Sequence, residues 1–355
     1  MVWGVWRAVL SLWGYLIWRL GLIGPDAGRE WLHGIRPATE GIRAALVDIW
    51  LRWDTVHYVR IIQDGYGPDE RSAFFPLYPF LGKAFNLLSG GDEVLGLLVA
   101  SNLAAIGSFA LLDHLSQSVE PHPILKNLVF YPSAFFLLVA YPQSLVLFFS
   151  LAAYVSQRKR LIGLTFLLGL AAGLTHPTAI SLSVLLFINA LGFKRQRWPW
   201  LLVALAPMLG MGAFMAWRIW SGYPSFQVLL SSIWGKTVEV GVDLTGMMTA
   251  RIWLARGWPN LLALLLGIGA FTWSYKRKLY DWLGFLAALL IIPILTAPAF
   301  EPLAGLGRYA LAAFPVYFAI STWLPGGWKR VALLALAIGA NLYLSGLFVL
   351  WGFIG

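Results

Sequence analysis

Asp54, His57 and Tyr58 are the side chains whose types and spacing best suit proton transfer in this chain. They occupy positions i, i+3 and i+4 within the polar segment 52–81, which places them on one face if that part is helical. A carboxylate held beside an imidazole and a phenol can take a proton from a hydroxyl group. A second interpretation stays open, in which Asp54 and His57 form a structural pair that ties this segment to its surroundings.

Polar residues also stand at three other junctions between apolar runs. Arg308 suits a phosphate group because a guanidinium matches phosphate oxygens; its alternative is a charge that snorkels to a membrane surface. His176 can either donate to a phosphate or cap a neighbouring helix end. With Asp54 as the candidate catalytic residue, the candidate substrate-binding residues are His57, Tyr58, Tyr78, Tyr141, Gln143, His176, Arg308 and Tyr309.

The sequence carries no pattern typical of metal, nucleotide or thiol chemistry. It has no cysteine, no DxD pair, no HExxH and no GxxxxGK phosphate loop. Asp64, Asp69 and Glu70 surround a Gly-Tyr-Gly turn, where they could hold a cation, although the favoured interpretation is a solvated loop edge. We therefore predict no cofactor and no metal site, with assistance by a divalent cation left open.

Composition places these residues in a membrane protein. Hydrophobic residues make up 59% of the 355 positions, and the mean hydropathy is +0.73. No polar stretch is long enough for a separate soluble domain, so residues 1–355 form one predicted all-α membrane domain. Apolar runs near the length that crosses a bilayer predict about 11 transmembrane helices, at 3–23, 93–113, 124–139, 142–156, 161–175, 177–192, 198–220, 259–275, 279–297, 308–324 and 328–353.

The positions of the basic residues predict the orientation of this domain. Short basic clusters at 157–160, 194–197, 276–278 and 329–330 fall in alternate connections, which is the pattern of the cytoplasmic side. The N-terminus is then cytoplasmic, and the C-terminus and candidate site lie on the outer face, with the plasma membrane of a prokaryote as the expected location. The net charge of +10 is dispersed among these clusters, which favours a membrane over a nucleic acid as partner.

Two long loops face outward in this topology, at 24–92 and 221–258. The first is patterned enough to predict secondary structure of its own. We expect an amphipathic helix that lies along the membrane surface and ends at Gly65, with apolar positions at Ala45, Ile49, Val56, Val59 and Ile62.

The order of these motifs resembles the PIG-V-like mannosyltransferases, relatives of the second mannosyltransferase of GPI-anchor synthesis within the multi-span GT-C glycosyltransferases. RWDTVHYVRIIQDGYG (52–67) followed by AFFPLYPFL (73–81) is similar to that family's WD…GY…FFPxYP signature. The chain departs from the family at His176, where an arginine is usual, and at Gln143, where a glutamate is common. Three later segments are similar to further family motifs, namely FYPSAFFLLVAYPQSLVLFFSLAAY (130–154), GLTHPTAI (173–180) and GLGRYALAAFPVY (305–317).

The resemblance implies a GT-C-like bundle that transfers a hexose, typically mannose, from a polyprenyl-phosphate donor to a lipid or glycolipid acceptor. It implies that Asp54 is the general base, with inversion at the anomeric carbon. Arg308 and His176 are then the candidates to neutralise the leaving lipid phosphate. A different class of function stays open, a lipid or lipid-linked sugar transporter or flippase without transfer chemistry. Transporters usually hold ionisable groups near the midplane and often carry internal repeats, and the sequence shows neither feature.

Overall fold

The computed structural model describes residues 2–24, 27–88, 90–119, 128–131, 133–193, 197–234, 257–295, 303–324 and 326–352. These residues form α-helices joined by short 3-10 turns and contain no strand, so the predicted all-α class is confirmed for this part of the chain. The α-helices are α1 (Val2–Arg19), α2 (Gly41–Leu46), α3 (Asp54–Asp64), α4 (Leu77–Leu88), α5 (Glu93–Val119), α6 (Gln143–Arg158), α7 (Ile162–Gly173), α8 (Ile180–Leu191), α9 (Arg197–Val203), α10 (Ala206–Trp220), α11 (Phe226–Trp234), α13 (Trp258–Lys276), α14 (Tyr280–Leu295), α15 (Leu306–Tyr309), α16 (Phe314–Trp323) and α17 (Gly327–Val349).

The apolar helices are compatible with a membrane protein. Three stretches of the described chain are long and apolar enough to cross a bilayer, at 93–117, 197–220 and 327–349. Shorter apolar helices accompany them, so the predicted count of about 11 spans is not confirmed and stays a prediction. Large apolar side chains are exposed on several helices, as expected of surfaces that meet lipid, among them Leu12, Leu20, Leu167, Leu202, Ile219, Trp220, Val331 and Leu336.

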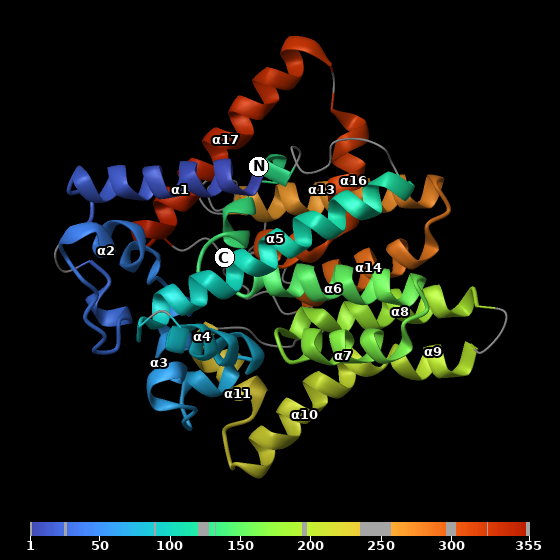
Figure 1. The fold of residues 1–355 in the computed structure, drawn as a ribbon, viewed down its shortest axis with the longest axis horizontal. Coiled ribbons are helices and arrows are strands. Elements are labelled where there is room, and N and C mark those ends of the chain that lie inside the picture. The colour runs from blue at the N-terminus through green and yellow to red at the C-terminus, as the bar shows by residue number, and fades with distance from the viewer. Residues whose placement is uncertain are drawn as a thin grey trace.

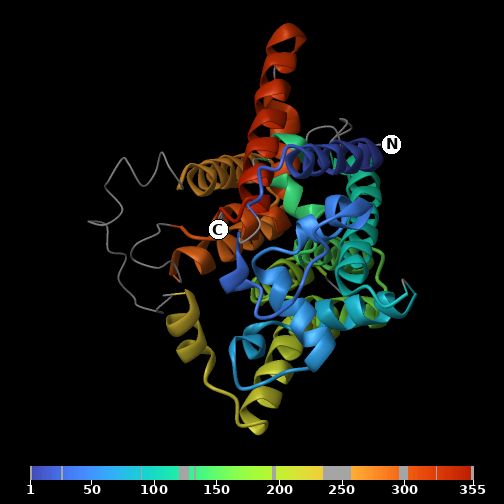
Figure 2. The same cartoon turned by 90° about the vertical axis from the view of Figure 1, so that its left-hand side faces the viewer.

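Neighbouring helices in the sequence are mostly neighbours in space. α5 packs against α4 and α6, α6 packs against α7, and α8 packs against α14 (Figure 1). α17 packs against α1 at one end and rises above the rest of the molecule at the other (Figure 2). The C-terminal helix α17 therefore returns to α1, the first helix of the chain. Within the loop that follows α1, α3 packs against α4 and α5.

Two glycines allow α7 and α10 to approach closely. A Cβ atom at Gly173 would lie 2.0 Å from the carbonyl oxygen of Pro207, and one at Gly210 would lie 2.3 Å from the carbonyl oxygen of Leu170. Small residues at such crossings let helix backbones touch, which is a common packing device between apolar helices. Any larger residue at these two positions must push the helices apart.

The predicted span at 124–139 is wrong for its described residues, which form 3-10 turns instead of a long helix. Residues 128–130 and η5 (Ala134–Leu137) are 3-10 turns, and the chain reaches α6 through a buried irregular segment. The side chain of Asn341 in α17 explains how this backbone is tolerated inside an apolar protein. Its Oδ1 accepts from the N–H of Phe135 (3.2 Å), and its Nδ2 donates to the carbonyls of Val129 and Tyr131 (2.9 and 3.0 Å).

Two further predicted elements are broken in the structure. The span at 308–324 divides into α15, the 3-10 turn η9 (Ala310–Ala312) and α16, where Pro315 occupies the first turn. The amphipathic helix expected in the first loop divides into α2, the 3-10 turn η2 (Asp48–Trp50) and α3, which ends at Gly65 as predicted. Residues 235–256 of the second predicted loop lie outside the described residues.

Candidate functional site

An ion pair joins the two residues that sequence analysis ranked first as base and phosphate partner. Nη1 of Arg308 lies 2.6 Å from Oδ2 of Asp54, although the two residues are 254 positions apart. The side chain of Asp54 is 20% exposed and that of Arg308 is 14% exposed. The pair is therefore largely buried but open on one side, which is how a reactive group reachable by a substrate must lie.

An irregular backbone conformation at Trp53 puts Asp54 at the start of α3. Trp53 has φ +52° and ψ −124°, a backbone conformation that is unfavourable for a bulky residue, and the helix begins directly after it. The backbone N–H of Asp54 donates to the hydroxyl of Tyr141 at 3.1 Å. A carboxylate in the first turn is also favoured by the helix dipole. Asp54 is thus fixed at a helix end and not in the middle of a continuous helix.

A separate turn holds Arg308 in place. Gly305 precedes α15 with φ +82°, a conformation that glycine adopts at little cost. Gly307 is then held from both sides, because its N–H donates to Oδ1 of Asn260 at 2.8 Å and its carbonyl accepts from the hydroxyl of Ser133 at 2.6 Å. These two bonds anchor the backbone next to Arg308, so its guanidinium projects from a rigid turn.

Aromatic rings surround the guanidinium of Arg308. Its Cζ atom lies 5.4 Å from the ring centre of Tyr141, 5.2 Å from that of Tyr309 and 5.9 Å from that of Phe136. Cation–π contacts of this kind hold a guanidinium in an apolar setting. Nη2 reaches the hydroxyl of Tyr309 at 3.4 Å, whereas the buried Nε makes no hydrogen bond within the described part of the chain. One strong donor of Arg308 is thus still available.

Tyr58 and Tyr78 form the inner wall of the site. Their rings meet edge to face at 4.7 Å. The hydroxyl of Tyr78 lies 2.9 Å from that of Ser101, which donates to the carbonyl of Tyr141 at 2.8 Å. Burial, and next the charge of Asp54, raises the pKa of Tyr58, so its phenol stays protonated at neutral pH. Tyr78 therefore supports the ion pair indirectly. It packs against Tyr58 and is linked through Ser101 to the backbone of Tyr141.

His176 reaches the site through Tyr309. The two rings are 5.1 Å apart. Nδ1 of His176 accepts from the N–H of Thr178 at 3.3 Å and lies 2.8 Å from that residue's hydroxyl, so the histidine caps the turn η6 (Pro177–Ala179). The helix-capping interpretation of His176 therefore holds, and the capped ring stands next to the aromatic group around Arg308.

Two of the predicted site residues are not bonded to the ion pair in the described part of the chain, although His57 is close enough to feel the charge of Asp54. Gln143 is buried at the first position of α6, and neither a hydrogen bond nor an ion pair joins its side chain to Asp54 or Arg308 among the described residues. His57 stacks on Phe74 with ring centres 4.8 Å apart and faces Glu70. Burial lowers the pKa of His57 to about 4, which makes its imidazole neutral at neutral pH.

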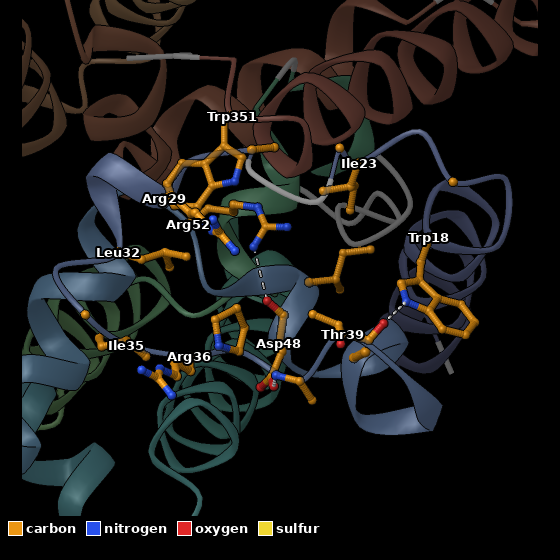
Figure 3. A pocket seen from close by; sticks show the side chains of 18 residues that line it. Trp18, Ile23, Arg29, Leu32, Ile35, Arg36, Thr39, Asp48, Arg52 and Trp351 are labelled. Atoms are coloured by element: carbon orange, nitrogen blue, oxygen red, sulfur yellow. Dashed lines mark hydrogen bonds between the residues drawn. The ribbon is translucent and has the colours of Figure 1, made fainter.

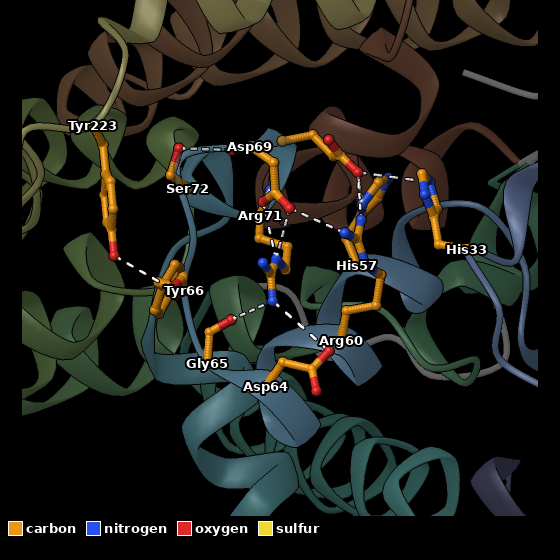
Figure 4. Close-up of polar contacts among 11 residues, drawn as sticks. His33, His57, Arg60, Asp64, Gly65, Tyr66, Asp69, Arg71, Ser72 and Tyr223 are labelled. Atoms are coloured by element: carbon orange, nitrogen blue, oxygen red, sulfur yellow. Dashed lines mark hydrogen bonds and ion pairs between the residues drawn. The ribbon is translucent and has the colours of Figure 1, made fainter.

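Arginines neutralise the acids of the turn that follows α3. Nε of Arg71 donates to both carboxylate oxygens of Asp69, at 2.9 and 3.0 Å, and its Nη1 lies 3.8 Å from Asp64. Arg60 bridges Asp69 and Glu70 (Figure 4). The acid trio at this turn therefore belongs to an ion-pair network with Arg60 and Arg71.

A cavity of about 1030 Å³ is lined mostly by residues of the first loop, among them Asp48 and Arg52, together with Trp18 and Trp351 (Figure 3). Neither Asp54 nor Arg308 lines it. Arg52 is fixed there by bonds to the carbonyls of Val349 (2.7 Å) and Leu51 (2.9 Å), and its guanidinium stacks over the ring of Trp351 at 4.9 Å. This cavity is thus separate from the Asp54–Arg308 pair.

Sequence reasoning missed the residues that position the ion pair. Ser133 and Asn260 hold the turn of Arg308, Phe136 covers its guanidinium, and Trp53 starts the helix of Asp54. The available signal was Asn260 itself, a polar side chain near the start of the apolar helix α13. A buried amide of this kind needs a hydrogen-bond partner. No sequence signal marks Phe136 or the conformation of Trp53.

Comparisons with known proteins identify no relative. No family model, no curated protein and no solved structure matches this chain.

Proposed function

We propose that this protein is a membrane glycosyltransferase of the GT-C type. It moves a hexose, typically mannose, from a polyprenyl-phosphate donor to a lipid or glycolipid acceptor. The observation that carries the proposal is the largely buried, partly open pair of Asp54 and Arg308. A carboxylate and a guanidinium at one place supply the two charges that such a transfer requires. The motif resemblance around both residues supports the same assignment.

The proposed step uses Asp54 as general base. The acceptor hydroxyl attacks the anomeric carbon, a new C–O bond forms, and its proton passes to the carboxylate of Asp54. The C–O bond to the lipid phosphate breaks on the opposite face, so the configuration inverts, and the bonding electrons leave on the phosphate. Arg308 stabilises that negative charge, as a guanidinium does in other phosphate-leaving reactions.

Arg308 has two roles in this proposal, as the partner of Asp54 and as the partner of the phosphate. While Arg308 pairs with Asp54, its Nη1 donates to Oδ2 of the carboxylate, and that oxygen is engaged. A phosphate that takes over donors of Arg308 releases Oδ2 to accept the proton of the acceptor hydroxyl. The unpaired Nε and the long contact of Nη2 with Tyr309 support this exchange of partners. Donor binding then prepares the base in the same step that positions the sugar.

The surroundings of the pair support a lipid-linked donor. Tyr309 is only partly buried and gives the site an aromatic face on which a sugar ring can stack, whereas Tyr141 and Phe136 are buried and hold the guanidinium of Arg308. The ring of His176 packs against that of Tyr309 and can therefore set the orientation of this tyrosine at the site. Apolar helices next to the site offer surface for a polyprenyl chain, with the outer face of a prokaryotic plasma membrane as the proposed location.

The test is a transfer assay with purified protein in lipid vesicles, radiolabelled polyprenyl-phosphate mannose and a membrane lipid extract. Wild-type protein should form a labelled glycolipid, and Asp54→Asn should lower the rate by roughly 10²–10⁴-fold. Asp64→Asn is the matched control, since Asp64 is at the end of the same helix with a side chain that is 66% exposed. Near-normal transfer by Asp54→Asn in folded protein rules out this residue as base.

The same assay separates the proposal from a transporter or flippase. A flippase moves labelled donor between leaflets without forming a new glycosidic bond, so its label stays on the polyprenyl phosphate. Translocated donor with no labelled acceptor, at any donor concentration, favours the transporter.

A further inference from the structure

His33, His57 and Glu70 form a His–His–Glu cluster beside α3. Nε2 of His33 lies 3.6 Å from Oε1 of Glu70, and Nδ1 of His57 lies 3.9 Å from the same oxygen. The three donor atoms are all within 4.8 Å of one another. Figure 4 shows His33 and His57 turned toward this carboxylate from two separate parts of the loop.

A partnerless nitrogen within the cluster points to a ligand. Nδ1 of His57 is inaccessible to solvent and makes no hydrogen bond among the described residues. A buried polar atom without a partner is costly, and such atoms in native proteins usually have a missing water or ion. Stacking on Phe74 fixes the ring, so the nitrogen cannot turn away to find another partner.

The donor set and its spacing suit a borderline divalent cation. Two imidazoles and one carboxylate are the ligands of open zinc sites, where a water completes the coordination. Bonds of about 2.0–2.1 Å in a tetrahedron put neighbouring donors about 3.3 Å apart. The separations of 3.6 and 3.9 Å to Glu70 exceed this value by a few tenths of an ångström, and the two histidine donors, which lie within 4.8 Å of each other, also move closer when the ion binds.

The charges around the cluster are compatible with a cation. Asp64, Asp69 and Glu70 carry three negative charges, and Arg60 and Arg71 carry two positive ones. A carboxylate has several lone pairs, so Glu70 can accept from Arg60 and bind a metal together. Nη2 of Arg60 donates to Asp69 at 3.0 Å while its Nη1 pairs with Glu70. Arg60 can therefore act as an outer partner that orients Glu70 as a metal ligand.

We propose that His33, His57 and Glu70 bind a zinc-like divalent cation that fastens the first loop to α3. The cation joins His33 in the loop, His57 in the middle of α3 and Glu70 in the following turn. The side chain of His33 is 35% exposed, which gives the ion a path from water and leaves a coordination position open. The sequence predicted no metal because His33 is distant from the other two ligands along the chain.

We assign this cation the role of holding the loop to α3, and it takes no part in the proposed transfer step. His57 follows Asp54 by one helical turn, so a metal there fixes the helix that carries the ion pair with Arg308. Without the cation the loop before α2 is held to α3 through weaker contacts, among them the ring contact between His33 and His57 at 5.6 Å. We therefore expect bound metal to raise the thermal stability of the protein.

The test is titration of purified, chelator-treated full-length protein with Zn²⁺ by calorimetry. Wild type should bind one equivalent, and His33→Asn should weaken binding by at least tenfold. Asparagine is chosen because His33 has φ +48°, which asparagine tolerates well. His114→Asn, at an exposed position of α5, is the matched control and should bind as wild type does.

Two further measurements keep the result decisive. Co²⁺ in place of Zn²⁺ should give visible absorption bands that change in His33→Asn, and Zn²⁺ should raise the melting temperature of wild type but not of this variant. His57→Gln in folded protein should behave as His33→Asn does. Absence of Zn²⁺ binding by wild type, or equal binding by wild type and His33→Asn, overturns the proposal.

Discussion

At the scale of single residues, both the proposed function and the local stability depend on the pair of Asp54 and Arg308. A largely buried ion pair leaves a costly lone charge when one partner is removed, although the residual exposure of both side chains reduces that cost. Function and stability then respond differently to the same substitutions, because the chemistry needs both groups whereas the fold needs only charge balance.

A double-mutant cycle exploits this difference. Asp54→Asn and Arg308→Gln should each lower stability by up to about 3 kcal/mol, and the double variant should recover a large part of the loss because neither charge is left alone. Transfer should be lost in all three variants. Thermal unfolding in detergent measures the first effect and the vesicle assay the second. Strictly additive destabilisation would show that the pair does not couple in the folded protein.

At the scale of elements, helix contacts place the site residues. The sequence was sufficient to predict most helices, since apolar runs of the right length are local features. It was not sufficient to predict the breaks at Trp53 and at 133–142, because these depend on partners such as Tyr141 and Asn341. A buried irregular backbone is stable only when distant side chains satisfy it, and no local pattern records those partners.

The crossing of α7 and α10 offers a test at this scale. Gly210→Ala should destabilise the protein by roughly 1–3 kcal/mol, since its Cβ would overlap the carbonyl of Leu170. Gly212→Ala is the control, because a Cβ there meets nothing within 4 Å and alanine favours a helix by about 1 kcal/mol. Thermal unfolding of both variants measures the difference. Equal stability of the two would mean that the helices are not in close contact at Gly210.

At the scale of the whole molecule, the open matter is which side of the membrane the site faces. The predicted topology puts the basic connections in the cytoplasm and the Asp54 loop outside. The chain has no cysteine, so single cysteines can be introduced without a background signal.

Labelling of such cysteines in intact cells tests the orientation. Glu40→Cys should react with a membrane-impermeant maleimide from outside, whereas Lys159→Cys and Lys276→Cys should react only after the membrane is opened. All three positions are exposed, so poor labelling cannot come from burial. Reaction of either lysine variant in intact cells contradicts the predicted orientation and the outer location of the site.

The sequence by itself determined the apolar helical character of the chain and the residue types from which we predict its proton-transfer chemistry. Composition and local spacing are enough for that, because helix formation and side-chain chemistry are properties of short segments. Only the tertiary structure decided that Arg308 meets Asp54, that Gln143 and His57 make no bond to this pair among the described residues, and that His33 lies with His57 beside Glu70. Such meetings depend on how distant helices and turns pack, and that packing is set by the whole buried surface and not by any one segment.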